Sequence, residues 1–249
     1  MAVNPALRYV AGRVVRAAAV APGAARYLRD RSAYRQLPGA EALRWRDSFP
    51  KLTDRVASSP FDPHYFHQDT WAARRIAERR PARHVDVGSR VDLVGFLTAV
   101  TSVVFVDIRP LEVDIEDFES LAGSILDMPF PDQSLESISC LHVAEHIGLG
   151  RYGDPLDPLG TRKAAAELQR VLRPGGSLLF SGPVGRGRTC FNAHRVHDVD
   201  AVVEEFFPEL ELVEFSGVDD RGVFRRHRDL AELRGSHYAC GMYHFKRPA

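Results

Sequence analysis

The chain has 249 residues, with 33 basic and 33 acidic side chains and a formal net charge of zero. This balance excludes the basic surface with which proteins grip a nucleic-acid backbone. The three cysteines, Cys140, Cys190 and Cys240, match neither a disulfide framework nor the spacing of a zinc motif. No apolar run has the length of a membrane span. The sequence therefore predicts a cytoplasmic protein without stable membrane insertion and without nucleic acid as a partner.

Residues 1–60 are predicted to form a basic helical extension, followed by a main domain over residues 61–249. The first 50 residues carry nine arginines and only three acidic side chains. Apolar residues recur there at helical spacing, at Leu7, Val10, Val14 and Ala18. Because this stripe holds small side chains, we favour a helix that packs on the core or on a second subunit of a homodimer. A helix that binds an anionic membrane is the alternative.

Residues 83–107 have the pattern of a strand, a turn, a helix and a second strand. The β-branched run His84–Val87 ends at Gly88, where a glycine lets the backbone approach a ligand closely. Asp107 ends the second run, 21 residues after Asp86, near the spacing at which an acid accepts hydrogen bonds from a ribose. A βαβ unit places its ligand at the carboxyl ends of the strands. The pattern therefore predicts a nucleoside-containing cofactor.

The segment His64–Arg79 is predicted to be the helix that opens the main domain. Tyr65 and Gln68 lie one turn apart on it and could reach over the cofactor as a lid, or they could be ordinary surface and capping residues. Further along, the sequence predicts a loop with a short helix at Glu112–Glu119 and helices at Thr161–Leu172 and Asp198–Phe207. The remaining strands are predicted at Ser137–Leu141, Ser177–Ser181, Leu210–Phe215 and Tyr238–Phe245.

The segment Leu141–Gly150 contains His142, Glu145 and His146 in an HxxEH arrangement. On a helix the two histidines would share one face, as zinc ligands do in the inverted metalloprotease motif. The segment follows a strand, however, and two glycines directly after it oppose a helix, so we reject zinc at this motif. Mg²⁺ held by Glu145, Asp154 and Asp157 stays open as an alternative, because hard oxygen ligands suit that ion.

In their order and spacing these segments resemble the class I S-adenosylmethionine-dependent methyltransferases over residues 83–249. The matching motifs are Val85–Gly88, Val106-Asp107, Asp127–Asp132, Glu145-His146 and Val171–Gly176. The resemblance implies an α/β fold with a Rossmann-like, seven-stranded, mostly parallel sheet, helices on both faces and the last strand antiparallel. One departure is Arg90, which stands where the family usually has a second glycine.

The same resemblance implies S-adenosylmethionine as the cofactor. It places Asp107 at the ribose, Asp127 at the adenine and Gly88 beside the methionine part. The other cofactor contacts that we expect are Asp86, Ser89, Ile108, Met128, Leu141 and His142, with Tyr65 and Gln68 from the first helix.

More narrowly, His84–Arg90, Glu145–Asp154 and Phe191–Arg195 resemble actinobacterial sugar O-methyltransferases, such as that of mycobacterial methylmannose polysaccharide synthesis. This resemblance implies in-line transfer of a methyl group to a hydroxyl of a sugar or oligosaccharide. A sugar hydroxyl is a poor acid, so a base is expected. The candidates are His142, His146 and His194, with Glu145 orienting the basic histidine. The expected sugar contacts are Tyr152, Arg195 and Trp71.

Two other functions stay open. An NAD-dependent oxidoreductase shares the βαβ beginning and the ribose acid, although Gly88-Ser89-Arg90 lacks the remaining glycines of the dinucleotide fingerprint. A non-catalytic, methyltransferase-like scaffold would act through the basic N-terminal segment on a protein partner and would bind no cofactor.

Overall fold

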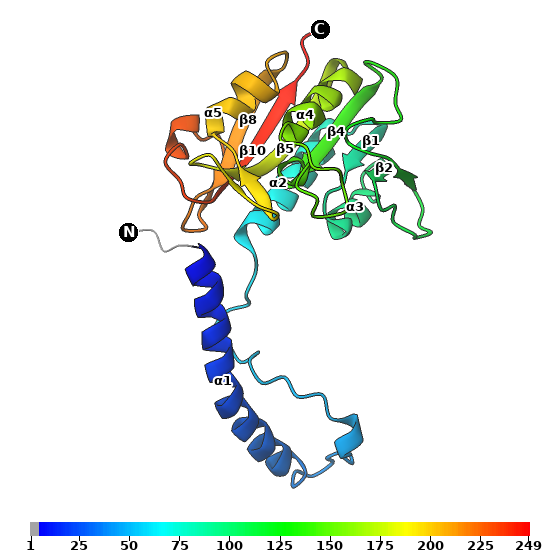
Figure 1. The fold of residues 1–249 in the computed structure, drawn as a ribbon. Coiled ribbons are helices and arrows are strands. Elements are labelled where there is room, and N and C mark those ends of the chain that lie inside the picture. Colours follow the sequence, from blue (N-terminus) through cyan, green and yellow to red (C-terminus); the bar gives the residue numbers. More distant parts are fainter. Residues whose placement is uncertain (1–4) are drawn as a thin grey trace. The chain divides into compact units, whose positions relative to one another are not determined.

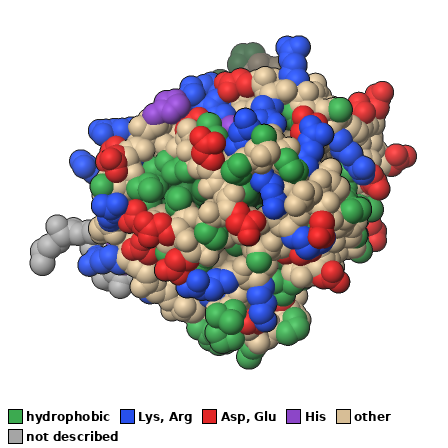
Figure 2. Space-filling view, turned by 90° about the horizontal axis from the view of Figure 1, so that it is seen from above, with side chains coloured by type: hydrophobic (Ala, Val, Ile, Leu, Met, Phe, Trp, Pro, Cys, Tyr) green, Lys and Arg blue, Asp and Glu red, His purple; other side chains and the backbone are tan. Residues whose placement is uncertain are grey.

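The computed structural model describes residues 5–249, with side chains from Val20 onward. The chain divides into two compact units between Phe61 and Asp62 (Figure 1), and we describe each by itself. None of the described helices combines the length and the apolarity that a membrane crossing requires. On the face shown in Figure 2, acidic and basic side chains are interspersed, and hydrophobic side chains gather between them.

The N-terminal unit consists of the helix α1 (Pro5–Tyr34), the short 3₁₀ helix η1 (Trp45–Asp47) and extended segments. Arginines of α1 hold the segment that follows the helix: Arg26 donates to the Leu52 carbonyl at 3.0 Å and Arg31 to the Leu43 carbonyl at 2.9 Å. The Arg31 guanidinium also lies over the Trp45 ring, 4.2 Å from its centre. The predicted apolar stripe from Leu7 to Ala18 lies outside the residues whose side chains are described.

The second unit is built on one sheet with the strand order β3-β2-β1-β4-β5-β10-β8-β9. Strands β3 to β5 in this order pair in parallel, and β10 is antiparallel to both of its neighbours. The Rossmann-like sheet with an antiparallel last strand is thus confirmed, and the two-residue strand β9 is an addition at one edge. The strands are β1 (Arg83–Val87), β2 (Ser102–Asp107), β3 (Phe118–Ala122), β4 (Leu135–Leu141), β5 (Leu172–Val184), β8 (Glu211–Val218), β9 (Phe224–Arg225) and β10 (Ala239–Lys246).

Helices cover both faces of this sheet (Figure 1). The helices α2 (Pro63–Arg79) and α3 (Val91–Leu97) pack on one face, and α4 (Gly160–Val171), α5 (Val199–Ala201) and the π-helical turn η3 (Val202–Phe206) pack on the other. Successive residues of a strand point to opposite faces. In β2, Phe105 therefore joins the cluster under α2 and α3, whereas Val104 and Val106 join the cluster under α4. Burial on both faces explains why this strand is apolar throughout.

Three elements differ from the sequence prediction. No short helix forms in Glu112–Glu119: the segment is irregular up to β3, which pairs with the edge of β2. β5 begins at Leu172 instead of Ser177. The strands β6 (Arg188–Cys190) and β7 (His194–Val196) form an unpredicted hairpin beside the main sheet. The short strands β3, β6 and β7 are partly exposed, so their sequences lack the apolar alternation by which a strand is recognised.

A buried ion pair fixes the middle of α2 to the sheet. Arg75, 6% exposed, donates to both carboxylate oxygens of Glu214 on β8, at 2.8 and 3.3 Å. Trp71 donates its indole N–H to the same carboxylate at 3.1 Å. Burial opposes ionisation of Glu214, but the hydrogen bonds from Ser216, Arg75 and Trp71 outweigh it and lower the pKa of Glu214 to about 2.

We expect Glu214→Ala to lower the free energy of unfolding by about 3–5 kcal/mol, because the variant leaves Arg75 buried without its partner. Glu211→Ala, at an exposed position of the same strand, should change it by less than about 0.5 kcal/mol. Urea denaturation at pH 7 measures both. Because the folded pKa of Glu214 lies below the ordinary value of 4.5, its stabilisation is present above pH 4.5 and is lost as the pH falls toward 2. Equal destabilisation by the two variants would contradict this assignment.

Candidate active site

Two adjoining cavities open at the carboxyl ends of the parallel strands. The first has a volume of about 430 Å³ and is bounded by the turn after β1, the end of β2 and the loop after β3. The second, of about 230 Å³, is bounded by the start of α2, the end of β4 and the β6–β7 hairpin. Four residues line both cavities and so join them: Gly88, His142, His146 and Tyr152.

The turn after β1 passes close to the first cavity. Gly88 has φ +65°, and a Cβ atom there would lie 3.2 Å from Val143 Cγ1 and 3.4 Å from Asp107 Oδ2. Behind the turn, the fully buried Asp86 accepts hydrogen bonds from Ser89 N, at 3.0 Å, and from the Ser139 hydroxyl. Burial raises the pKa of Asp86 to about 6. Asp86 therefore holds the turn and lies outside the lining of both cavities, contrary to the direct cofactor contact that we expected.

Ser89 and Leu141, two further expected contacts, both line the second cavity. The Ser89 hydroxyl accepts a hydrogen bond from Leu141 N at 3.2 Å, and this bond ties the first turn to the end of β4. The turn and the strand end thus form one wall.

Asp107 lies at the end of β2 and lines the first cavity together with Ile108. Its Oδ1 accepts from Arg109 N at 2.7 Å. Asp127 and Met128, which we also expected at the cofactor, do not line this cavity, and the wall here is formed by Ser124, Ile125 and Leu126. Met128 is 3% exposed and packs in the core under α4, and Asp127 is exposed outside the cavity lining.

His142 follows β4 in the left-handed backbone region, with φ +57°, and its N–H donates to the Ser181 carbonyl at 3.0 Å. Its Nδ1 lies 2.5 Å from Gln68 Oε1. Because an amide oxygen only accepts, Nδ1 carries the proton and Nε2 has the lone pair. Nε2 is buried and has no hydrogen-bond partner among the described residues. Burial lowers the pKa of His142 to about 3, so the ring is neutral.

Gln68 is fully buried and also accepts a hydrogen bond from the Ser181 hydroxyl. The predicted lid role of Gln68 is therefore wrong: it holds His142 from behind. Tyr65, its neighbour on α2, lines the second cavity, with its ring centre 5.2 Å from that of His142.

Glu145 and His146 lie in η2 (Ala144–His146), a single 3₁₀ turn. A zinc site of the HxxEH type requires these residues to lie on an α-helix, and that helix is absent here. His146 Nδ1 lies 2.6 Å from the Ala193 carbonyl, which only accepts, so His146 Nε2 has the lone pair. Burial lowers the pKa of His146 to about 4.

Glu145 is 1% exposed, and within the described chain neither carboxylate oxygen has a hydrogen-bond partner. Its Oε1 lies 3.7 Å from His146 Nε2. Burial raises the pKa of Glu145 to about 8. At pH 7 the two side chains are therefore a neutral acid beside a neutral base.

The hairpin completes the second cavity. His194 on β7 lines it, and burial lowers the pKa of this histidine. The His194 ring centre lies 5.1 Å from that of Tyr238, which lines the same cavity. Tyr152, at the junction of the cavities, lies under the guanidinium groups of Arg109 and Arg151, at 4.6 and 5.0 Å from its ring centre.

Two expected sugar contacts are structural. Trp71 is 2% exposed and bonded to Glu214, so it is a core residue. Arg195 donates to the Ile147 carbonyl at 2.6 Å and to the Asp157 carbonyl at 3.1 Å, and it lines neither cavity. Its guanidinium ties the hairpin to the loop after β4. Both side chains form hydrogen bonds with residues that are distant in the sequence, so neighbouring residues could not indicate these structural roles.

The proposed magnesium ligands do not meet. Asp157 accepts from Lys163 Nζ at 2.7 Å, and Asp154 accepts from Gly148 N at 2.6 Å. Among the described residues, the potential ligands that converge are His64, His142 and Cys240, which the sequence analysis did not select. They come from three segments that lie 78 and 98 positions apart, so no local spacing could reveal them.

One family model matches just under half of the chain. A family model described as "Caenorhabditis protein of unknown function, DUF268" matches residues 86–207, which is 122 of the 249 residues. No curated protein sequence matches the chain. The matched region begins in β1 and ends after η3, so it contains the strand ends that build both cavities.

Solved structures resemble the chain at low sequence identity. The N-methyltransferase NodS from Bradyrhizobium japonicum WM9, in complex with S-adenosyl-L-homocysteine, is 18% identical, with a TM-score of 0.53 over 76% of this chain and 89% of that one. A Burkholderia thailandensis 1,6-didemethyltoxoflavin-N1-methyltransferase, with bound 1,6-didemethyltoxoflavin and S-adenosylhomocysteine, is 15% identical, with a TM-score of 0.50 over 78% and 94%. The [4+2]-cyclase SpnF is 14% identical, with a TM-score of 0.51 over 73% and 81%. The chain therefore has the Rossmann-like methyltransferase fold, which also occurs in a cyclase.

We expect Glu145→Gln to change how stability depends on pH. The folded pKa of Glu145, about 8, lies above its ordinary value of 4.5, so the folded chain holds an extra proton between these values. The free energy of unfolding should fall as the pH rises from 4.5 to 8, by at most about 1.4 kcal/mol per pH unit. Glu145→Gln keeps the shape and removes this slope, whereas the exposed control Glu204→Gln retains it. Parallel stability curves for wild type and Glu145→Gln would contradict a neutral Glu145.

Proposed function

We propose that the protein is an S-adenosylmethionine-dependent O-methyltransferase whose acceptor is a hydroxyl of a sugar or oligosaccharide. The observation that carries the proposal is the junction of two cavities at one edge of the sheet. The first cavity contains Asp107, the acid at the end of β2, and adjoins the smaller, polar second cavity. The side chain of His146 lines both cavities, and its Nε2 is unprotonated.

The first cavity suits the cofactor. Its volume of about 430 Å³ falls within the usual range for small-molecule sites. Gly88 has φ +65°, and a Cβ there would lie 3.2 Å from Val143 Cγ1, so a side chain at this position would be strained and would crowd the turn beside the cavity. Asp107 would accept hydrogen bonds from the ribose, and the apolar Ile125 and Leu126, which line the same cavity, would pack against the base. When bound, S-adenosylmethionine supplies an electrophilic methyl group.

His146 is the base that the geometry favours. The Ala193 carbonyl holds its Nδ1–H and so fixes both the ring orientation and the tautomer, as an orienting acceptor does in a catalytic triad. Burial lowers the pKa of His146 to about 4, so the ring is neutral at pH 7 and becomes a stronger base when a nearby negative charge stabilises its imidazolium form. Glu145 lies 3.7 Å from Nε2, where its carboxylate form would stabilise the imidazolium. His142 is held through Nδ1 by Gln68 in the same way, but it is the more buried of the two, and burial lowers its pKa further, to about 3. His194 also lines the cavity.

The second cavity takes only the end of an acceptor. At about 230 Å³ it is smaller than a typical ligand pocket, so a longer acceptor would extend into solvent. Tyr65, Tyr152 and Tyr238 line it, and aromatic rings pack against the apolar faces of sugars while their hydroxyls form hydrogen bonds. The sequence resemblance to polysaccharide-associated enzymes makes methylated mannosides the first acceptors to test.

For the cofactor, we expect the purified protein to bind S-adenosylhomocysteine in isothermal titration calorimetry and not to bind NAD. Asp107→Ala should weaken this binding about 10- to 100-fold, through loss of charged hydrogen bonds. Asp114→Ala, at an exposed position of the same loop region, should leave it unchanged. Binding of NAD instead would favour the oxidoreductase, and binding of neither would favour the non-catalytic scaffold.

For the base, we expect His146→Ala to lower kcat about 100- to 10,000-fold with little change in S-adenosylhomocysteine affinity. The exposed His227→Ala serves as the matched control. Because the pKa of His146 is about 4, wild-type turnover should persist down to about pH 5, below the range in which an ordinary histidine becomes protonated. Normal turnover of His146→Ala would instead point to His142 or His194.

A further inference from the structure

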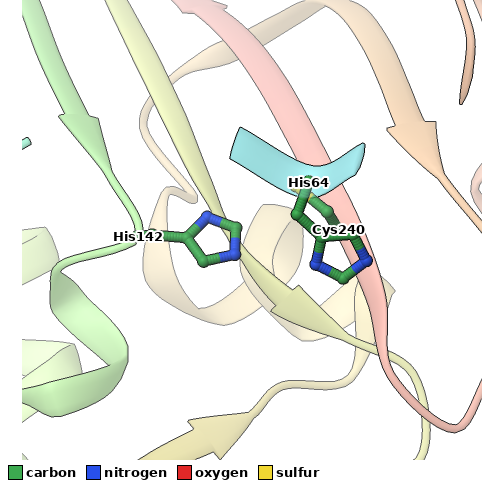
Figure 3. A group of neighbouring side chains, drawn as sticks. All are labelled: His64, His142 and Cys240. Atoms are coloured by element: carbon green, nitrogen blue, oxygen red, sulfur yellow. The ribbon is translucent and has the colours of Figure 1, made fainter. Parts of the chain in front are cut away.

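Two imidazoles and a thiol converge behind the wall of the second cavity. His64 comes from the first turn of α2, His142 from the end of β4 and Cys240 from β10 (Figure 3). Their potential ligand atoms all lie within 4.8 Å of one another. Three elements of the fold thus bring one ligand atom each to a common point.

His142 presents a nitrogen that needs a partner. Its Nδ1 is engaged by Gln68, while Nε2 is buried without a hydrogen bond inside the described chain. In Figure 3 the His142 ring points toward His64 and Cys240. The left-handed backbone of His142, unusual for a residue with a Cβ, holds the ring in this direction.

The other two groups are well supported. Cys240 is fully buried on β10, which lies between β5 and β8, and its Sγ makes a long 3.9 Å contact with the carbonyl of the next residue. The Asp62 carboxylate caps α2 by accepting from His64 N at 2.9 Å, and this cap fixes the backbone that carries His64. The ring of His64 stacks on Tyr238, with 5.4 Å between ring centres.

We propose that His64, His142 and Cys240 bind a zinc ion. Two imidazole nitrogens and a thiolate are ligands of the type that zinc prefers, whereas magnesium and calcium require oxygen. Three protein ligands leave a fourth position for water or substrate, as in catalytic zinc sites. On binding, the Cys240 thiol releases its proton to solvent and coordinates as the thiolate.

The ion requires a small closure of the site. Zinc bonds of about 2.0–2.1 Å to nitrogen and about 2.3 Å to sulfur place tetrahedral ligand atoms about 3.3–3.6 Å apart. From separations of up to 4.8 Å, the side chains must move together by about 1 Å. His64 is the half-buried member of the three, so a rotation of its ring supplies this movement without displacing the strands.

His142 lines the second cavity, so an ion on its Nε2 lies at the cavity wall. There it would polarise the oxygen of an acceptor and help His146 to remove the proton. This role rests on the proposed function, whereas the binding of the ion does not.

Metal content tests the site directly. The untagged full chain, dialysed against a small excess of Zn²⁺ and then against metal-free buffer, should retain one zinc per chain by mass spectrometry. Cys240→Ala and His142→Ala should lose at least nine-tenths of it, while Cys190→Ala and His227→Ala retain it. No retained zinc in the wild type, or retention by Cys240→Ala equal to that of Cys190→Ala, would overturn the proposal.

Cobalt substitution gives a second readout that depends on the sulfur ligand. The Co²⁺ form should show a sulfur-to-metal charge-transfer band that is lost in Cys240→Ser, a variant of nearly the same volume with unchanged circular dichroism. A band that persists in Cys240→Ser would overturn the assignment of Cys240. Zinc binding without S-adenosylhomocysteine binding would leave the metal site standing and refute the proposed function, and the reverse result would refute the metal site alone.

Discussion

The position of the site depends on one buried amide. Gln68 Oε1 accepts from His142 Nδ1 and from the Ser181 hydroxyl, and so ties α2 to the ends of β4 and β5. The buried Gln68 oxygen thus has two hydrogen-bond donors. Without this oxygen, each donor would be buried without a partner, and the folded state would be less stable. The same bond decides which nitrogen of His142 is free. Farther along α2, Arg75 and Glu214 form a second clamp, so the helix that carries His64 and Tyr65 is fixed at both places.

Depth of burial separates the roles of similar side chains. Asp86 and Asp107 lie near the carboxyl ends of two neighbouring parallel strands. Asp86 is fully buried behind the turn and accepts a hydrogen bond from its backbone, whereas Asp107 lines the first cavity. The buried groups around the junction are held in their uncharged forms: burial lowers the pKa of His142 and His146 and raises that of Glu145. A neutral, partly desolvated junction strengthens the electrostatic effect of any charge that a reaction creates there.

The sequence predicted what depends on neighbouring residues. The βαβ beginning and the strand of Asp107 follow from periodicity and turn chemistry over a few positions. The predictions that were wrong concern residues whose roles depend on partners far away in the sequence. Trp71 has the aromatic surface of a sugar contact, but Glu214, 143 positions away, engages it in the core. Strand β3 is made by pairing with β2 and not by its own composition, and Cys240 meets two histidines only because β10 inserts between β5 and β8.

The hairpin of β6 and β7 links the shape of the second cavity to the orientation of His146. Its turn supplies the Ala193 carbonyl that orients His146, and its second strand supplies His194 as a wall. If the hairpin moves away, the imidazole loses its orienting group at the same moment as the second cavity opens to water. The orientation of His146 and the closure of this cavity are therefore one event and not two.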